Sequence, residues 1–252
     1  MKYILDYYKQ VAAILDELSK QTEDYKKAGQ MIADAVKNKK LIHIVGTEMH
    51  SSIAAEEIFF RAGSLANINP LYDPTFSVTH SAARSLYLKE ADFCGQFLFE
   101  YYRNIQKGDL ILIIDTDGIG KACKEVVEKS KEMELSVIVV TSRNFSEVVN
   151  DNCPYRNSEK INLCNMDGID LVIDSKIPAF DTIIRFEELN INSGWVSTIA
   201  NSFILNAIIL AAIETIEKEN IEADIWDNFY EANGLQKNEA LIDKYIEKVK
   251  HI

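Results

Sequence analysis

Cysteine is scarce in this chain, and its spacing excludes two common uses of the residue. The four cysteines (Cys94, Cys123, Cys153 and Cys164) are scattered through 252 residues without a C-x-x-C pair. A disulfide framework or a structural zinc site needs cysteines at paired spacings. We therefore expect reduced thiols and a cytoplasmic location. Separately, no metal or other cofactor is expected.

Basic residues are too few for broad contact with polyanions. The chain has 27 Lys and Arg against 39 Asp and Glu, a formal net charge of -12. Nucleic acids and anionic membranes repel such a surface, so neither is an expected partner. No apolar run is predicted to span a membrane. The first 20 residues carry Asp6, Asp16 and Glu17 within an amphipathic helical pattern, unlike a signal peptide.

Glycine-rich phosphate loops are also missing. The chain has no G-x-G-x-x-G turn, no Walker loop and no nucleophile elbow. This disfavours a nucleotide-binding doubly wound domain, although the chain does contain the alternating strands and helices of that architecture.

Five short apolar runs predict strands, and helical patterns separate most of them. The strong runs are apolar on both faces, as parallel strands covered by helices are. We predict a three-layer α/β/α, flavodoxin-like doubly wound fold with a five-stranded parallel sheet and extra helices at both ends. The expected strands are 41–45, 66–71, 110–114, 137–141 and 170–174; the expected helices are 3–18, 25–36, 52–62, 92–103, 119–133, 197–218 and 236–250. Loops are expected over 142–169.

One domain accounts for the whole chain. Residues 1–38 supply N-terminal helices, 39–220 the core and 221–252 a helical tail. The helix over 197–218 is apolar on most of its circumference, which indicates burial on two sides, one against the sheet and the other against a second subunit. We therefore expect a homodimer or homotetramer.

Polar side chains gather where three predicted strands end. Ligands of open parallel sheets bind outside these carboxyl ends. A single Ser or Thr at such a turn is often only a helix cap, but three hydroxyl-bearing turns in one sheet predict a ligand site. Its expected residues are Gly46, Thr47, His50, Ser51 and Ser52; Asp115, Thr116, Asp117 and Gly118; and Thr141, Ser142 and Arg143.

Several segments carry a family resemblance. They are "IHIVGT", "AEEIFFRAGSLANINPL", "GDLILII", "VIVVTS", "DLVID" and "GWVSTIANSFILNAI". The chain resembles the sugar isomerase (SIS) domain family, and within it the small single-domain phosphosugar-binding or isomerase proteins. The resemblance implies a dimeric or tetrameric protein that binds a sugar or sugar phosphate through Ser and Thr in these turns.

The chain departs from that family pattern at two turns. Glu48 and Met49 replace the second glycine of the first turn, which is longer by one residue. The second turn, S-x-S-G in the family, is here Asp115–Thr116–Asp117–Gly118. A carboxylate about 5 Å from a phosphate dianion repels it by roughly 6 kcal/mol at an effective dielectric near 20, whereas a helix N-terminus returns about 0.3–2 kcal/mol.

Three arrangements would allow these carboxylates in a turn that binds phosphate in the family. Asp117 caps its own helix, or both carboxylates hold a hard cation such as Mg²⁺, or the ligand presents sugar hydroxyls or an amino group here. In each case the preference of the turn for anions is weakened or redirected.

Aldose–ketose isomerisation needs a base, and an acid or base that opens the ring. In SIS isomerases that this chain resembles, a Glu on the helix after the first turn often acts as the base, which implies Glu56 or Glu57 here. The alternative for Glu57 is an i,i+4 pair with Arg61. His80 matches a His of the family and is suited to ring opening, although Ser81 replaces the Glu that usually follows.

Other polar residues have competing interpretations. Arg143 supplies positive charge or is merely solvated, and Ser197 and Thr198 contact ligand or cap the long apolar helix. His43, inside a strand, is expected to be structural, and His251 carries no signal. The leading hypothesis is a SIS protein that binds a phosphorylated or amino sugar, as an isomerase. The rival is a non-catalytic sugar sensor or a degenerate scaffold.

Overall fold

A five-stranded parallel sheet forms the centre of the protein. The structure is a computed structural model, and it describes residues 2–252. The strand order is β2-β1-β3-β4-β5, the flavodoxin order that the sequence predicts. The strands are β1 (Ile42–Gly46), β2 (Ile68–Pro70), β3 (Leu110–Ile114), β4 (Ser136–Thr141) and β5 (Leu171–Asp174). Because β2 and β3 lie on opposite sides of β1, the strand order reverses between β1 and β3.

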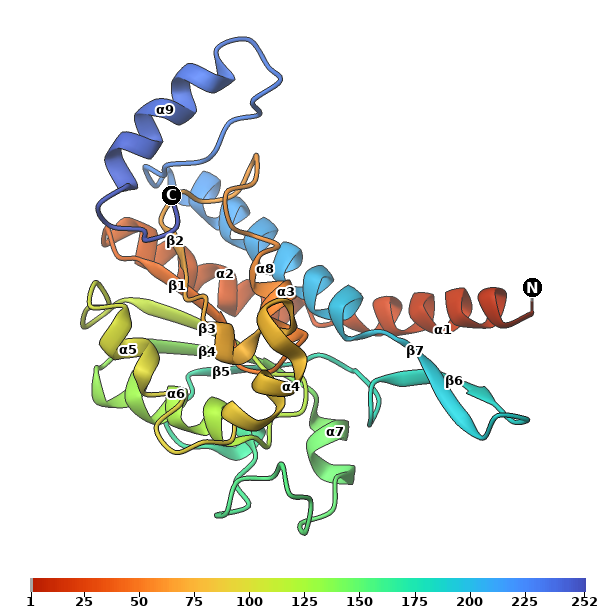
Figure 1. The fold of residues 1–252 in the computed structure, drawn as a ribbon. Helices are drawn as coiled ribbons and strands as arrows, with labels where there is room; N and C mark the ends of the chain where they lie inside the picture. Colours follow the sequence, from red (N-terminus) through yellow and green to blue (C-terminus); the bar gives the residue numbers. More distant parts are fainter. Residues whose placement is uncertain (1) are drawn as a thin grey trace.

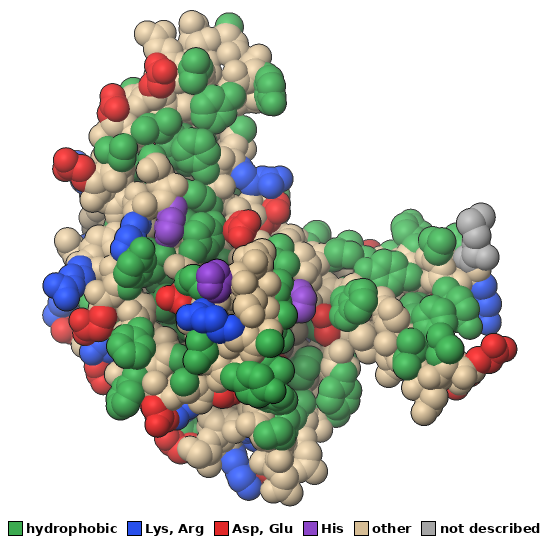
Figure 2. All heavy atoms as spheres, viewed as in Figure 1, with side chains coloured by type: hydrophobic (Ala, Val, Ile, Leu, Met, Phe, Trp, Pro, Cys, Tyr) green, Lys and Arg blue, Asp and Glu red, His purple; other side chains and the backbone are tan. Residues whose placement is uncertain are grey.

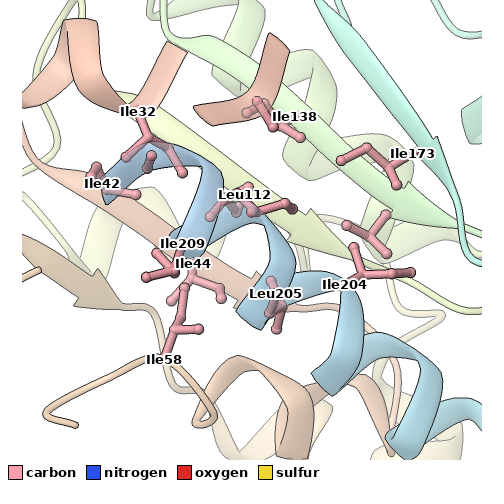
Figure 3. Packing of buried hydrophobic residues seen from close by; sticks show 14 of the residues in the cluster. Ile32, Ile42, Ile44, Ile58, Leu112, Ile138, Ile173, Ile204, Leu205 and Ile209 are labelled. Carbon is pink, nitrogen blue, oxygen red and sulfur yellow. The ribbon is translucent and has the colours of Figure 1, made fainter. Parts of the chain in front are cut away.

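Helices cover both faces of the sheet (Figure 1). On one face, α2 (Thr22–Lys37), α3 (Ser51–Ala55) and α8 (Ser197–Glu219) pack on one set of strand side chains. On the other, α5 (Phe97–Tyr101) and α6 (Lys121–Glu132) pack on the alternate set. Figure 3 shows residues of α8 over Ile44 and Leu112. This two-sided burial is why the strands are apolar at most positions on both faces.

The long helix α8 belongs to this core. By length and composition it is apolar enough to cross a membrane, which corrects the expectation that no segment is. Its side chains Ile204, Leu205 and Ile208 are buried in the cluster under the sheet. Its neighbour α2 approaches closely at Gly29, where a Cβ atom would lie 2.6 Å from the carbonyl carbon of Ala211.

Two parts of the chain project from the core (Figure 1). Helix α1 (Lys2–Ser19) lies along a hairpin of β6 (Thr182–Phe186) and β7 (Ile191–Trp195), which the sequence analysis did not predict. The Tyr7 hydroxyl donates to the carbonyl of Trp195 at 2.7 Å, and the rings of Tyr3 and Phe186 are 4.4 Å apart. Helix α9 (Gly234–Tyr245) projects from another corner.

Three predicted segments differ from the structure, and one helix was not predicted. The helix expected over 52–62 ends at Ala55, before Phe60, whose positive φ leaves the helical region. The helix expected over 92–103 shortens to α5. The loop after β2 contains a short 3₁₀ turn (Pro74–Phe76) and then α4 (Val78–Leu88), and the irregular stretch 142–169 contains α7 (Arg143–Val148) and a second 3₁₀ turn (Leu163–Asn165).

Candidate functional site

Thr47 and Asp115 meet where the strand order reverses. They directly follow β1 and β3, and the Thr47 hydroxyl donates to Asp115 Oδ2 at 2.6 Å. Both residues are almost fully buried. Since ligands of doubly wound sheets bind at this switch point, the turns around the pair define the candidate site.

The first turn is closed by its own carboxylate. Glu48 accepts hydrogen bonds from the backbone N–H groups of His50 and Ser51, at 3.0 and 2.8 Å, and from the Ser51 hydroxyl at 2.5 Å. Gly46 is needed here, because a Cβ atom on it would lie 2.2 Å from the carbonyl carbon of Ser51. The glutamate that departs from the family pattern therefore caps α3.

Three carboxylates bind the second turn. Asp115 Oδ1 accepts the N–H of Gly118 at 2.7 Å, and Asp117 Oδ1 accepts that of Ile119 at 3.1 Å. Glu90 Oε2 accepts the N–H of Lys121, the first residue of α6, at 3.2 Å. The carboxylate of Asp117 is therefore bound within its own turn, but it does not cap α6, whose N-cap residue is Gly120 and has no side-chain cap.

A buried lysine that the sequence analysis missed balances these charges. Lys89, at the end of α4, is 6% exposed, and its ammonium lies 3.5 Å from Glu90 Oε1 and 3.8 Å from Asp117 Oδ2. Burial by itself lowers the pKa of Lys89, but Asp117 and three other nearby carboxylates raise it above its usual value. The side chain therefore stays cationic. No sequence pattern indicates that Lys89 lies near this turn, because α4, which places it there, was not predicted.

Two carboxyl groups near Lys89 have raised pKa values, whereas an ordinary ion pair lowers the pKa of its carboxyl group. Burial, with the charges of Asp117 and Glu48, raises the pKa of Asp115 well above its usual value. Burial also raises the pKa of Glu90. The site therefore holds more carboxylate than its single adjacent lysine stabilises in the charged form.

A chain of uncharged polar groups crosses the site. The Ser51 and Thr116 hydroxyls are 3.3 Å apart, and Asn201 Nδ2 of α8 donates to Thr116 Oγ1 at 3.2 Å. Within residues 2–252, Asn201 Oδ1 and Thr141 Oγ1 are buried without a hydrogen-bond partner. Asn201 was missed because it lies inside an apolar helical pattern.

The remaining predicted hydroxyls make local bonds. Ser52 donates to the carbonyl of Met49. Ser142 accepts the N–H of Phe145 at 3.0 Å and caps α7. The Ser197 hydroxyl donates to Asp181 at 2.6 Å. Thr198 is partly exposed beside it, and Arg143 is exposed. The capping interpretation therefore holds for Ser142, whereas α8 has no side-chain cap from Ser197, and Asp181 accepts the N–H groups of Val196 and Ser197 there.

The candidate catalytic groups lie toward the surface. Glu56, at the end of α3, is exposed, as are His50 and His80. Glu57 accepts a hydrogen bond from Asn206 at 3.1 Å and lies 3.5 Å from the Arg61 guanidinium. The i,i+4 pair considered for Glu57 is therefore present.

Tyr72, which lies near Glu56, packs against the C-terminal segment. Burial, together with the charge of Glu56, raises the pKa of Tyr72. The Tyr72 and His251 rings are 4.9 Å apart, and His251 Nε2 lies 2.7 Å from the Tyr102 hydroxyl. Burial and Lys250 lower the pKa of His251, so its neutral form is favoured. The sequence analysis assigned no signal to this histidine, because folding alone brings the C-terminus here.

His43 has the buried contacts expected of a structural histidine. Its Nε2 lies 3.0 Å from Asp109 Oδ2 and its Nδ1 lies 3.0 Å from Asn69 Nδ2. A cleft of about 910 Å³ is lined by Leu41, Asn67 and Asp109 among others. These residues precede β1, β2 and β3, so the cleft lies at the end of the sheet opposite the switch point. The part of the chain that the structure describes contains no group of three His, Cys, Asp or Glu side chains arranged to hold a metal ion.

Comparison with known proteins identifies the family. The SIS domain profile matches residues 6–142, more than half of the chain. The chain belongs to the SIS domain family. This confirms the resemblance that the sequence segments predict.

Relatives of this SIS domain match it along its length. A UPF0309 protein of Listeria monocytogenes is 29% identical, over 98% of this chain and 97% of the relative. One of Oceanobacillus iheyensis is 26% identical over all of both chains. The agreement therefore extends beyond the matched domain to the C-terminal segment.

Two solved structures share the fold. Phosphoheptose isomerase GmhA of Neisseria gonorrhoeae superposes with a TM-score of 0.51 at 17% identity, over 86% of this chain and 98% of that one. The Vibrio vulnificus NanR protein complexed with ManNAc-6P also gives 0.51, at 11% identity, over 94% of this chain and 67% of that one. At these identities the likeness establishes the fold alone.

Proposed function

We propose that this SIS domain binds a carbohydrate derivative at the switch point between β1 and β3. The observation that carries the proposal is the chain of Ser51, Thr116 and Asn201 there, with Asn201 Oδ1 buried and unpaired among the described residues. Hydroxyl and amide groups are both donors and acceptors, which suits the hydroxyls of a sugar. The amino-sugar phosphate named with the NanR structure supports this class of ligand.

A binding experiment tests the proposal directly. Thermal unfolding is measured with sugar phosphates, amino sugars and nucleotides, with and without Mg²⁺. A ligand at about 100 times its Kd stabilises the folded state by about 2.7 kcal/mol and raises Tm. Asn201→Leu should abolish the shift, whereas Asn206→Leu, on the exposed side of the same helix, should retain it. A panel in which no carbohydrate shifts Tm contradicts the proposal.

For a catalytic role, we propose aldose–ketose isomerisation with Glu56 as the base. Glu56 follows the helix that begins at the first turn, and Glu57 is already held by Arg61 and Asn206. His80 is the proposed ring-opening group. The test is exchange of the sugar C2 proton in D₂O: Glu56→Gln should abolish exchange and Glu57→Gln should preserve it. Binding without exchange in the wild type would favour the non-catalytic sensor.

We also propose a cytoplasmic homodimer assembled through the projecting arm of α1 and the β6–β7 hairpin. Figure 2 shows hydrophobic side chains gathered on this arm. Its large exposed apolar side chains are Tyr3, Ile4, Leu5, Tyr8, Leu189, Ile191 and Trp195. Apolar patches of this kind mark interaction sites. Light scattering should give twice the chain mass for the wild type and the monomer mass for Leu5→Asp; a wild-type monomer contradicts the proposal.

A further inference from the structure

We propose that the second turn of this site binds an unphosphorylated, hydroxyl-bearing part of the ligand and rejects phosphate, because side chains of the protein already occupy its anion-binding N–H groups. The inference rests on the proposed carbohydrate site and narrows its ligand class. The side chains concerned are the carboxylates of Asp115, Asp117 and Glu90, with Lys89 as their counter-ion.

Three N–H groups at this turn are among those that a phosphate would use. They precede and begin α6, a 12-residue helix whose N-terminus favours negative charge. The N–H groups of Gly118, Ile119 and Lys121 each donate to a different carboxylate, at 2.7, 3.1 and 3.2 Å. A phosphate entering here has to displace these internal anions.

Lys89 completes this internal replacement. Its side chain is more than nine-tenths buried, and its ammonium lies between Glu90 Oε1 and Asp117 Oδ2. These separations of 3.5 and 3.8 Å exceed the roughly 2.7–2.9 Å of a charge-assisted hydrogen bond. Lys89 thus neutralises both carboxylates at once without binding tightly to either. The positive charge that a phosphate needs is already used by the protein.

The polar atoms left over around the turn include a pure acceptor, Asn201 Oδ1, and a hydroxyl that both donates and accepts, Thr141 Oγ1. Asn201 Oδ1 is buried without a partner among residues 2–252, and so is Thr141 Oγ1. Thr141 Oγ1 lies directly against the turn, since a Cβ atom on Gly118 would be 2.4 Å from it. A sugar hydroxyl can donate to Asn201 Oδ1 and exchange hydrogen bonds with Thr141, whereas a phosphate dianion has no donor for Asn201 Oδ1 and brings a charge that the carboxylates repel.

Titration calorimetry with inorganic phosphate tests the inference. Wild type should bind phosphate weakly, and Asp117→Ser should bind it at least about tenfold more tightly, because a repelling charge is lost and Lys89 is freed. Lys89→Met/Asp117→Ser should lose that gain. Asp170→Ser is the matched control, since Asp170 accepts the backbone N–H of Val137 near the start of β4, at the opposite end of the sheet from the turn, and should leave phosphate affinity unchanged.

Asp117→Asn is a second variant that removes the charge and keeps an acceptor for the N–H of Ile119. It should move phosphate affinity in the same direction if Asp117→Ser does not fold. Equal or tighter phosphate binding by the wild type than by these variants overturns the inference. The proposed function fails separately, when wild type binds none of the carbohydrates, whatever the phosphate titrations give.

Discussion

Replacing Lys89 by methionine tests how the buried charges of the site are stabilised. Methionine has a similar length, so the change removes the ammonium with little loss of packing. At an effective dielectric near 20, attraction across 3.5 Å to Glu90 and 3.8 Å to Asp117 amounts to about 5 and 4 kcal/mol. Burial of the ions offsets much of this, and loss of one partner of a buried pair costs about 3–5 kcal/mol. We expect a loss of that size.

The assay is urea unfolding at pH 7.5, followed by circular dichroism. Glu90→Gln in the Lys89→Met background should recover part of the loss, since it removes a carboxylate left without its counter-ion. Glu90→Gln alone should cost less than Lys89→Met. Lys107→Met is the control, because its ion pair with Glu134 is exposed and contributes little.

The pH dependence of Lys89→Met follows from the raised pKa of Glu90. A carboxyl group with a raised folded-state pKa stabilises the fold below its usual pKa, and this contribution is lost as pH rises through the folded-state value. Without Lys89 the pKa of Glu90 rises further, so the deficit of the variant should shrink as pH falls toward 4.5. A deficit below about 1 kcal/mol at pH 7.5 that does not change with pH refutes this reasoning.

Three further predictions concern packing, titration and thiol reactivity. Gly29→Ala should destabilise the fold in urea by about 1–3 kcal/mol despite a better helix propensity, because its Cβ meets the backbone of Ala211; a stabilised variant contradicts the close packing of α2 on α8. Asp115→Asn should gain stability relative to wild type as pH rises from 5 to 8.5, since the raised pKa of Asp115 makes its ionisation unfavourable; the opposite trend in urea unfolding refutes this. Cys94 and Cys123 are buried with raised thiol pKa values and should react with a thiol reagent only after unfolding; a slower native reaction in Cys123→Ser contradicts this.

Most of the sheet could be predicted from local sequence. Each strong strand is a short apolar run, because helices bury both of its faces. The run over 110–114 coincides with β3, and the others differ from their strands by one or two residues. The hairpin of β6 and β7 and helix α4 were missed, since their residues mix polar and apolar types without a clean period.

Some residues of the candidate site could also be predicted from local sequence, and others could not. The turns after β1 and β3 were predicted because adjacent residues build them, and the carboxylates of Asp115 and Asp117 pointed to weakened phosphate binding from the sequence alone. The sequence analysis did not identify Lys89, Glu90 or Asn201 as their partners. These residues lie far from the turn along the chain and carry no spacing signal.

The sequence by itself determined the layered fold and where the candidate site is proposed, because apolar period and turn chemistry are local properties. Tertiary structure decided the electrostatics of the site. Whether an acidic turn repels, chelates or is neutralised depends on which charges pack within a few ångströms of it, and α4 and α8 bring Lys89 and Asn201 there from distant positions.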